Sequence, residues 1–545
     1  MSQFVFYIPD ERWLPLAQRS CLIASDMMES PIPSQIKWEN DRLTVTLLEH
    51  DACRLQALVT MPTGERVLLP TVWLFPQWRP YRMELELVRG VISRLRRGAE
   101  VWQSNGLEVP DMFAGELQEI THKFLSCWRK QDQPNCSELL WPIMGRGHHL
   151  LSVLPGSLAK AQGIDVFQPF REQATTGQRP TGSENPSTAK FGTGLQIELE
   201  DLGLVPETIS SHLPARRKLF GLPLFARRDK PKESIHSADI LGDSSEIRTR
   251  LADVCSMPEL KWLEVGNDWK RSARIENTVN VENQIPDVVA EIRQKGRRII
   301  WGPVLPLRES CLPEGVKIGS DGSSVSEAFS GFLGKQLPLW QPHIDMVHLV
   351  SGINGTGVAG LTPTIQYHLV RSGLETIARL APQLPTMISF SQPLGERLAW
   401  SVGGQHPDQF LGKLAKERVP VQAIGLELDL GYFPSGTLPR DPLQWVMELQ
   451  RWAVWGVPVL AFLRVPSRPS AEPKRMIFAP GVKDAPSETT QRDFILEFSR
   501  LLSALPWIHG VIYAQWIDRN DRFGESGLNS ADGRPKQFLR EWLGC

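Results

Sequence analysis

The stretch VQAIGLELDLGYFPSGTLPRDPLQWVMELQRWAVWGVPVLAFLRVPS, residues 421–467, contains one complete unit of the fold. Two apolar runs that end in polar residues, 421–430 and 457–464, lie on either side of a segment with helical apolar spacing, 441–455. That segment opens with an Asp-Pro pair, which is typical of an N-cap followed by proline at the first helical position. The stretch therefore predicts a buried strand, a helix and a second buried strand.

The same alternation extends over the C-terminal half of the chain. Eight short apolar runs end in polar residues, and helix-like segments lie between most of them. A (β/α)8 barrel requires eight buried strands, each followed by an amphipathic helix, and its chemistry lies at the C-terminal strand ends. We therefore predict an α/β fold with a (β/α)8 TIM barrel over residues 216–545. The runs are 219–226, 262–267, 299–305, 344–350, 387–391, 421–430, 457–464 and 508–515.

An α+β region is predicted before the barrel. Residues 1–82 contain Val-, Leu- and Thr-rich runs and a hairpin-like Pro-Thr-Gly, which predict a β-rich N-terminal module. Residues 83–170 show helical apolar spacing and predict a helical segment. Residues 171–215 begin with a stretch almost free of large apolar residues, so we predict a polar linker or insert there.

Composition excludes several classes of function. The chain has 545 residues, of which 41% are hydrophobic and 22% charged, with a formal net charge of -1. This profile is typical of a soluble multidomain protein and argues against nucleic acid or an acidic membrane surface as the main partner. The seven cysteines contain no CxxC pair and favour free thiols in a reducing compartment. We see no export signal and no membrane-length apolar run, so we expect a cytoplasmic location.

Neither a metal nor a cofactor is expected. His148 and His149 have no acids or cysteines nearby at ligand spacing, and GINGTG (352–357) lacks the lysine of a phosphate loop. Instead, carboxylates, amides, a lysine, an arginine and a tryptophan follow the predicted strands. This mixture suits a polyhydroxylated ligand, because planar amides and acids bond hydroxyl pairs and an indole stacks on a sugar face. These residues include Asn267, Lys270, Glu396, Glu427, Asp429, Arg464, Gln515, Trp516, Asp518 and Asp521.

The order of these motifs resembles family-10 glycoside hydrolases, the xylanase-type barrels of clan A. VGNDWKR (265–271) is similar to the family's strand-two motif, GRRIIWGPVLPLRESCLP (296–313) to its strand-three run, and HGVIYAQWIDRNDRFGESGLNSADGRPK (509–536) to its last strand. The runs 421–430 and 455–467 resemble strands six and seven. The layout also resembles bacterial, planctomycete-type proteins with an N-terminal region before a diverged barrel. The resemblance implies a carbohydrate ligand and O-glycosyl hydrolysis.

The resemblance fails at the two positions that define the chemistry. The family's acid/base glutamate on strand four falls on Gly352, and its nucleophile on strand seven falls on Leu463. The strand-three histidine is replaced by Pro303. Because the retaining mechanism needs two carboxylates about 5–5.5 Å apart, the usual pair is absent on this alignment.

Some sugar-binding positions of the family are retained. Asn267 and Lys270 match positions that bind sugar hydroxyls beside the cleaved bond, and the alternative is a loop-capping Asn and a surface Lys. Gln515 and Trp516 lie near the family's aromatic platform on strand eight. Asp518 is expected to bind sugar or orient a partner, or else to cap the following turn.

Two glutamates are candidates for relocated catalytic carboxylates. Glu427 and Asp429 alternate with apolar neighbours and share one face of strand six, so Glu427 is either functional or paired with an arginine such as Arg464. Glu396 follows a turn beyond strand five and is either a functional residue at the rim or a solvated loop acid. A separation of about 6.5–9.5 Å between Glu396 and Glu427 would permit an inverting mechanism.

Two hypotheses follow. The first is an active glycoside hydrolase that uses Glu396 and Glu427 as catalytic residues. The second is a catalytically inactive barrel that serves as a glycan- or protein-binding module. The missing acids favour the second hypothesis, and the retained polar residues favour a ligand under either.

Overall fold

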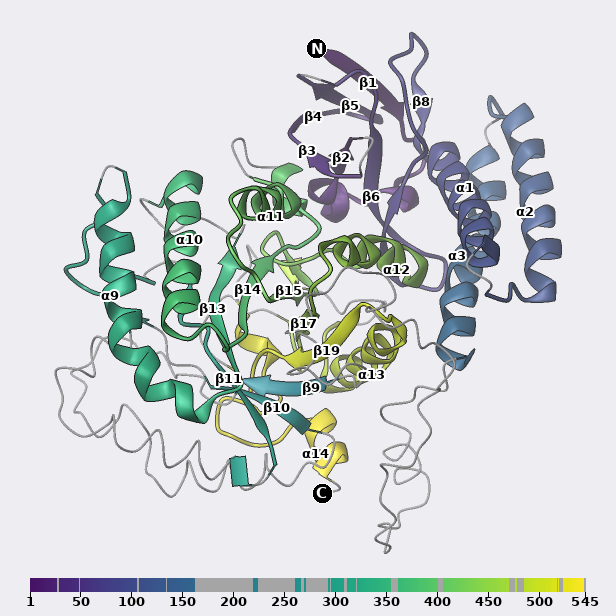
Figure 1. The fold of residues 1–545 in the computed structure, drawn as a ribbon. Helices are drawn as coiled ribbons and strands as arrows, with labels where there is room; N and C mark the ends of the chain where they lie inside the picture. The colour runs from purple at the N-terminus through teal and green to yellow at the C-terminus, as the bar shows by residue number, and fades with distance from the viewer. Residues whose placement is uncertain are drawn as a thin grey trace, which may run out of the picture.

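The fold has an N-terminal α+β region and a C-terminal barrel (Figure 1). The computed structural model describes residues 1–161, 219–223, 260–265, 269–270, 293–294 and 296–543. Shorter gaps within these ranges are 27–28, 49, 105–106, 134, 308–310, 320, 354–360, 400–404, 470–475, 478–484, 517 and 519–522. The predicted linker at 171–215 therefore lies outside the described residues.

Eight parallel strands close into a barrel (Figure 1). They pair in the order β9–β10–β11–β13–β14–β15–β17–β19, and β19 pairs with β9 to complete the ring. Each predicted apolar run overlaps one of these strands, so the predicted (β/α)8 barrel is confirmed. The strands are β9 Leu219–Pro223, β10 Leu260–Val265, β11 Arg298–Trp301, β13 Met346–Ile353, β14 Thr386–Ser391, β15 Ala423–Asp429, β17 Val459–Arg464 and β19 Ile508–Tyr513. Shorter strands are β12 Leu305–Pro306, β16 Tyr432–Phe433 and β18 Met476–Ile477.

Helices lie outside the barrel, and α12 begins at the cap that the sequence predicts. Asp441 caps α12 by accepting a hydrogen bond from the Gln444 backbone N–H at 3.0 Å, with proline at the first helical position. Ser487 and Thr490 form a capping box at the start of α13. In the described part of the chain, no helix combines the length and apolarity needed to cross a membrane. The helices are α9 Ser323–Trp340, α10 Pro363–Leu380, α11 Pro407–Lys416, α12 Pro442–Gln450, α13 Glu488–Ala504 and α14 Gln537–Leu543.

The barrel interior is apolar in one layer and polar in the next. Trp262, Met346 and Met387 belong to an apolar cluster contributed by the barrel strands. Side chains on a strand alternate between its two faces, so the residue two positions further along faces the same way. Those residues are polar on three of the strands: Glu264 follows Trp262, His348 follows Met346 and Ser389 follows Met387, and all three are buried.

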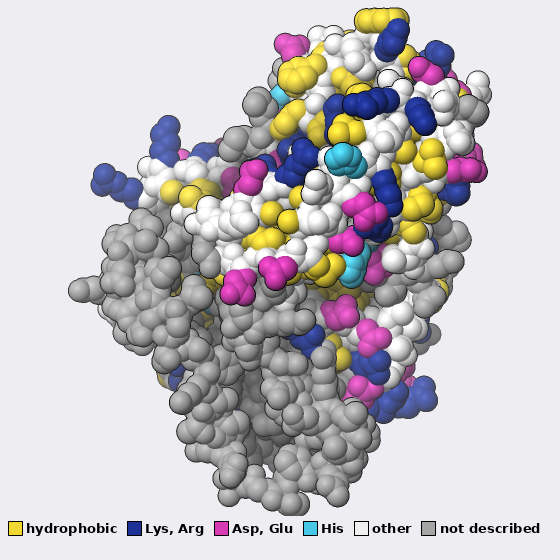
Figure 2. Space-filling view, turned by 90° about the vertical axis from the view of Figure 1, so that its right-hand side faces the viewer, with side chains coloured by type: hydrophobic (Ala, Val, Ile, Leu, Met, Phe, Trp, Pro, Cys, Tyr) yellow, Lys and Arg dark blue, Asp and Glu magenta, His cyan; other side chains and the backbone are white. Residues whose placement is uncertain are grey.

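The N-terminal region contains two four-stranded sheets and three helices. The sheet orders are β4–β5–β1–β8 and β3–β2–β6–β7. Figure 2 shows the face that carries these helices, where acidic, basic and apolar side chains are intermixed. The five described cysteines are buried and form no disulfide with one another. The elements are β1 Ser2–Tyr7, β2 Ile23–Ser25, β3 Pro31–Ile32, β4 Ser34–Glu39, β5 Arg42–Leu47, β6 Arg54–Thr60, β7 Arg66–Pro70, β8 Tyr81–Arg82, α1 Met83–Ser104, α2 Asp111–Arg129 and α3 Cys136–Ala161.

A seam joins the N-terminal region to the barrel beside β14 and β15. Leu58 and Leu68 of the second sheet pack with Leu438 of the loop that follows β16. Arg94 on α1 forms a buried 2.6 Å ion pair with Asp441, the N-cap of α12. The N-terminal region therefore packs against the barrel close to the C-terminal ends of two strands, and α1 lies near α12 in Figure 1.

Candidate ligand site at the barrel mouth

The C-terminal ends of the barrel strands, here called the mouth, hold the buried carboxylate of Glu427. Its side chain on β15 is 6% exposed. Oε1 accepts hydrogen bonds from Ser389 Oγ at 2.5 Å and from the Gly352 backbone N–H at 2.6 Å, and Oε2 accepts one from Ser391 Oγ at 2.8 Å. Gly352 has φ of 76°, a backbone conformation that favours glycine. Three uncharged donors from two neighbouring strands thus hold this carboxylate.

The environment of Glu427 favours its ionised form. Burial alone raises the pKa of the carboxyl, because a low-dielectric interior disfavours the charge. The positive charge of Arg464 and the hydrogen bonds from Ser389, Ser391 and Gly352 act in the opposite direction and outweigh burial. The pKa of Glu427 therefore lies below its ordinary value, and the group is an anion at neutral pH.

Glu427 ends a chain of hydrogen bonds that crosses the barrel interior. His348 Nε2 on β13 lies 2.9 Å from Ser389 Oγ, and its Nδ1 lies 2.5 Å from Glu264 Oε1 on β10. Ser389 has one hydroxyl proton, which it donates to the ionised Glu427, so its oxygen accepts from His348 Nε2–H. One further proton then lies between His348 Nδ1 and Glu264. We call Glu264, His348, Ser389 and Glu427 the interior chain.

Sequence analysis did not identify Glu264, His348, Ser389 or Ser391 as site residues. The available signal was their spacing along the strands. Glu264, His348 and Ser389 each lie two positions after an apolar inward-facing residue, and Ser391 lies two positions after Ser389. Close packing also contributes: a Cβ at Gly425 would lie 2.5 Å from the Cβ of Ser389, so glycine on β15 makes room for the serine. That contact between strands is not visible in the sequence.

Asp429 and Arg464 form an ion pair near Glu427. Arg464 Nη1 lies 2.6 Å from Asp429 Oδ1, with Asp429 1% and Arg464 22% exposed. The guanidinium carbon of Arg464 also lies 5.1 Å from the centre of the Phe523 ring. The predicted arginine partner of Glu427 thus forms its ion pair with Asp429, and its positive charge also lowers the pKa of Glu427.

Glu396 lies in a different environment from the one its sequence position suggested. It begins the 3-10 helix Glu396–Ala399 and is 0% exposed, so the alternative of a solvated loop acid is wrong. Its Oε1 accepts from Arg440 Nη1 at 2.8 Å and from the Leu438 backbone N–H at 3.3 Å. The positive charge of Arg440 offsets the free-energy cost of burying the carboxylate. The turn-like sequence around Glu396 gives no sign of this partner. Glu396 therefore belongs to the seam with the N-terminal region.

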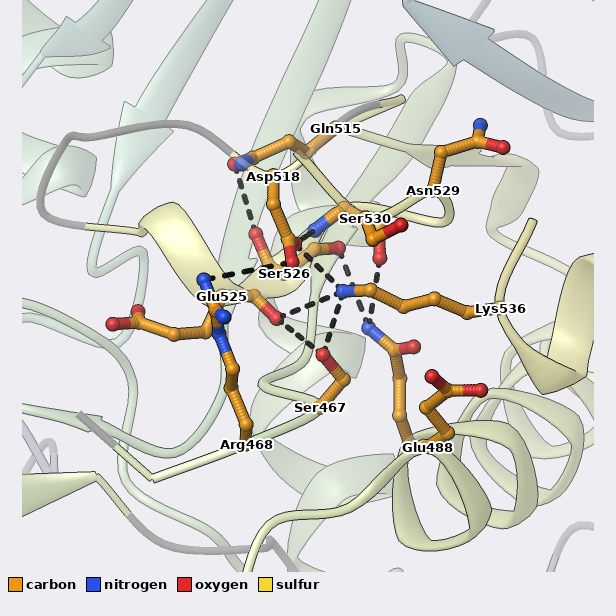
Figure 3. Close-up of polar contacts among 12 residues, drawn as sticks. Ser467, Arg468, Glu488, Gln515, Asp518, Glu525, Ser526, Asn529, Ser530 and Lys536 are labelled. Atoms are coloured by element: carbon orange, nitrogen blue, oxygen red, sulfur yellow. Dashed lines mark hydrogen bonds and ion pairs between the residues drawn. The ribbon is translucent and has the colours of Figure 1, made fainter. Parts of the chain in front are cut away.

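The predicted residues after β19 bind other parts of the protein (Figure 3). Asp518 Oδ1 accepts from Lys536 Nζ at 2.6 Å, and Lys536 also donates to Ser467 Oγ at 2.6 Å. Burial raises the pKa of Asp518 and lowers the pKa of Lys536, although their mutual attraction acts against both shifts. This buried pair fixes the loop after β19 to the loop after β17.

Gln515 and Trp516 are also buried. Gln515 Oε1 accepts from Ser526 Oγ at 2.9 Å, as Figure 3 shows. Trp516 belongs to the hydrophobic core and is 4% exposed, so its ring is enclosed by the protein. Both side chains therefore have structural partners in this conformation.

Strand two contributes only part of its predicted site. Lys270 is half-buried, whereas Asn267 lies outside the described residues. Asp521, which follows strand eight, also lies outside them. The ring of Trp269 packs 5.1 Å from that of Phe329, which makes it a core residue. Among the described side chains, no group of three His, Cys, Asp or Glu could hold a metal ion. The structure thus brings Glu427, Asp429 and Arg464 together and places Glu396 elsewhere.

Comparisons with known proteins give distant structural likeness alone. No protein-family model matches the chain, and no curated protein matches it. Xylanase 10B from Thermotoga petrophila in complex with xylobiose has 12% sequence identity and a TM-score of 0.40, covering 55% of this chain and 89% of that chain. Xylanase 10C from Cellvibrio japonicus in complex with xylopentaose has 11% identity and a TM-score of 0.42, covering 62% and 68%.

A third similar structure is a β-glucuronidase from Bifidobacterium dentium complexed with coumarin-3-O-glucuronide. It has 14% identity and a TM-score of 0.40, covering 61% of this chain and 46% of that chain. Likeness at this level establishes neither activity nor substrate. The barrel assignment rests on the closed ring of strand pairs.

Proposed function

We propose that the barrel binds a carbohydrate at its mouth, with Glu427, Asp429 and Arg464 forming the polar floor. The observation that carries the proposal is the ionised, buried carboxylate of Glu427 beside an ion pair whose guanidinium is partly exposed. Ligand sites combine a concave surface with a few well-placed polar groups, and planar carboxylate and guanidinium groups match pairs of sugar hydroxyls. The family-10 resemblance of the sequence motifs supports the same ligand class.

The arrangement of acids favours binding over hydrolysis. Two-carboxylate hydrolysis needs an acid and a base or nucleophile on opposite sides of one glycosidic bond. Asp429 and Asp518 each have a cation at 2.6 Å, and Glu396 has Arg440 at 2.8 Å. Of these four described acids, Glu427 is the one held by neutral donors, and we propose a carbohydrate-binding barrel without this chemistry.

Hydrolysis by Glu427 and Glu396 is the second candidate function. The low pKa of Glu427 supports it, because a nucleophile or base must be ionised. This candidate requires Glu396 to exchange Arg440 for the substrate. Under either function we propose Asn267 and Lys270 as ligand contacts, on the basis of the strand-two motif, with Gln515, Trp516 and Asp518 supporting the mouth.

Calorimetric titration with xylo-, cello- and manno-oligosaccharides tests the binding proposal. We expect Arg464→Lys to weaken binding about tenfold or more, because lysine keeps the charge beside Asp429 but loses the planar fork. Arg371→Lys on the exposed face of α10 is the matched control and should bind as the wild type does. Failure of all three oligosaccharide series to bind would contradict a carbohydrate function.

A hydrolysis assay separates the two candidate functions. Aryl xylosides, glucosides and glucuronides are incubated with the wild type, Glu427→Gln and Glu396→Gln. Release of aryl alcohol that both substitutions abolish would replace the binding proposal with the hydrolase. Oligosaccharide binding without release supports the binding barrel.

A further inference from the structure

We infer that a small oxyanion of the phosphate or carboxylate type binds in a pocket between the N-terminal region and the barrel. The pocket is small, is partly open to solvent, and lies where α1, β6 and α12 meet. Arg54, Arg94 and Arg97 line it together with Glu29 and Gln444. It is separate from the mouth, so the inference does not depend on the proposed carbohydrate function.

The charges around this pocket leave an excess of positive charge. Glu29 pairs with Arg54 and lies 3.8 Å from Arg97, and Arg94 pairs with Asp441 at 2.6 Å. Three guanidinium groups thus face two carboxylates. Glu448, further along α12, is not among the lining residues; Arg451 lies 3.5 Å from it and 3.1 Å from Asp408. A pocket with a net positive lining attracts an anion.

Arginine donors at the pocket also lack acceptors. Arg94 is 7% exposed, and within the described structure its Nε and Nη2 have no hydrogen-bond partner. Arg54 Nε likewise has none among the described residues. Buried polar donors are normally satisfied, and a guanidinium fork matches the paired oxygens of a carboxylate or phosphate. An oxyanion would supply both the missing charge and the missing acceptors.

The three arginines come from elements that fix the place of such an anion. Arg94 and Arg97 lie one helical turn apart on α1 and therefore on one face, whereas Arg54 lies on β6. Gln444 on α12 completes the lining from the barrel side. An anion bound here would contact both parts of the molecule and strengthen the seam between them.

Thermal unfolding of the full chain tests the inference. Inorganic phosphate, citrate and glucose 6-phosphate are titrated separately, with sodium chloride adjusted to hold the ionic strength constant. We expect a saturable rise in Tm of about 2 °C or more, because a ligand that binds the folded state alone stabilises it. Saturation by inorganic phosphate identifies the free anion, whereas a response to citrate or glucose 6-phosphate alone identifies an anionic group on a larger molecule.

Substitutions assign any rise to this pocket. Arg97 is 59% exposed, so Arg97→Met should fold normally and weaken the apparent affinity at least tenfold. Arg146→Met, on α3 away from the pocket lining, makes the same change in net charge and should leave the response unchanged. Arg94→Lys is a second variant that keeps a cation beside Asp441 but loses the guanidinium fork. The inference is overturned if none of the three anions raises Tm more than chloride does at the same ionic strength. It is also overturned if the rise in Tm persists in Arg97→Met.

Discussion

The barrel interior around Glu427 and the seam around Glu396 surround a buried glutamate with different partners. Both glutamates are nearly or fully buried, at 6% and 0% exposure. Glu427 accepts hydrogen bonds from two serine hydroxyls and one backbone N–H, whereas Glu396 meets the Arg440 guanidinium directly. Neutral donors leave a negative charge that a ligand can use, and a direct arginine cancels it. The partner, rather than the acid or its burial, separates a candidate ligand group from a structural ion pair.

The largest expected effect comes from removing the cation of the seam. Arg440→Met would leave Glu396 buried without its partner, and breaking a buried pair in this way costs about 3–5 kcal/mol. Urea unfolding of the wild type and the variant measures the loss. The double variant Glu396→Leu with Arg440→Met removes both charges and should recover most of the stability. A loss below about 1 kcal/mol in the single variant would contradict the structural role of this pair.

A smaller effect is expected from interrupting the interior chain. Ser389→Ala removes the hydroxyl between His348 and Glu427, leaving one ring nitrogen without its partner and Glu427 with one donor fewer. We expect a loss of about 2–3 kcal/mol in urea unfolding. Ser391→Ala is the matched control, because it removes one donor to the same carboxylate and leaves His348 untouched. Equal losses in the two variants would show that His348 gains nothing from Ser389.

The smallest of the three effects is a change in acid sensitivity. The folded-state pKa of Glu427 is depressed below its ordinary value of 4.5, so its stabilisation is present above that pH. The stabilisation is lost as pH falls through the folded-state pKa. Glu427→Gln should cost about 1–2 kcal/mol at neutral pH and flatten the fall in stability below pH 4.5. The same slope in both proteins, measured by urea unfolding at a series of pH values, would show that Glu427 is not the responsible group.

Much of the fold follows from local patterns. The apolar runs mark all eight barrel strands, and the Asp441-Pro442 pair marks the start of α12. The alternation of Glu427 and Asp429 with apolar neighbours predicts that both acids lie on one face of the strand, and the structure buries both. These predictions succeed because strand alternation and helix capping depend on residues a few positions apart.

The candidate site could be predicted only in part. Glu264, His348, Ser389 and Glu427 come from four strands, and their hydrogen bonds join residues separated by 38 to 84 positions. Glu396 and Arg440 are likewise 44 positions apart and meet only when two loops pack at the seam. No periodicity within one element records such pairings.

The sequence by itself determined that these strands form a barrel and that Glu427 and Asp429 share one face of their strand, because both follow from local apolar patterns and the two-residue repeat of a strand. Only the tertiary structure decided which acid keeps its charge available. A carboxyl's pKa depends on burial and on the charges and donors within a few ångströms, and closure of the barrel sets those distances. Loop packing at the seam placed Glu396 against Arg440, and closure of the barrel left Glu427 at the mouth with Ser389, Ser391 and Gly352.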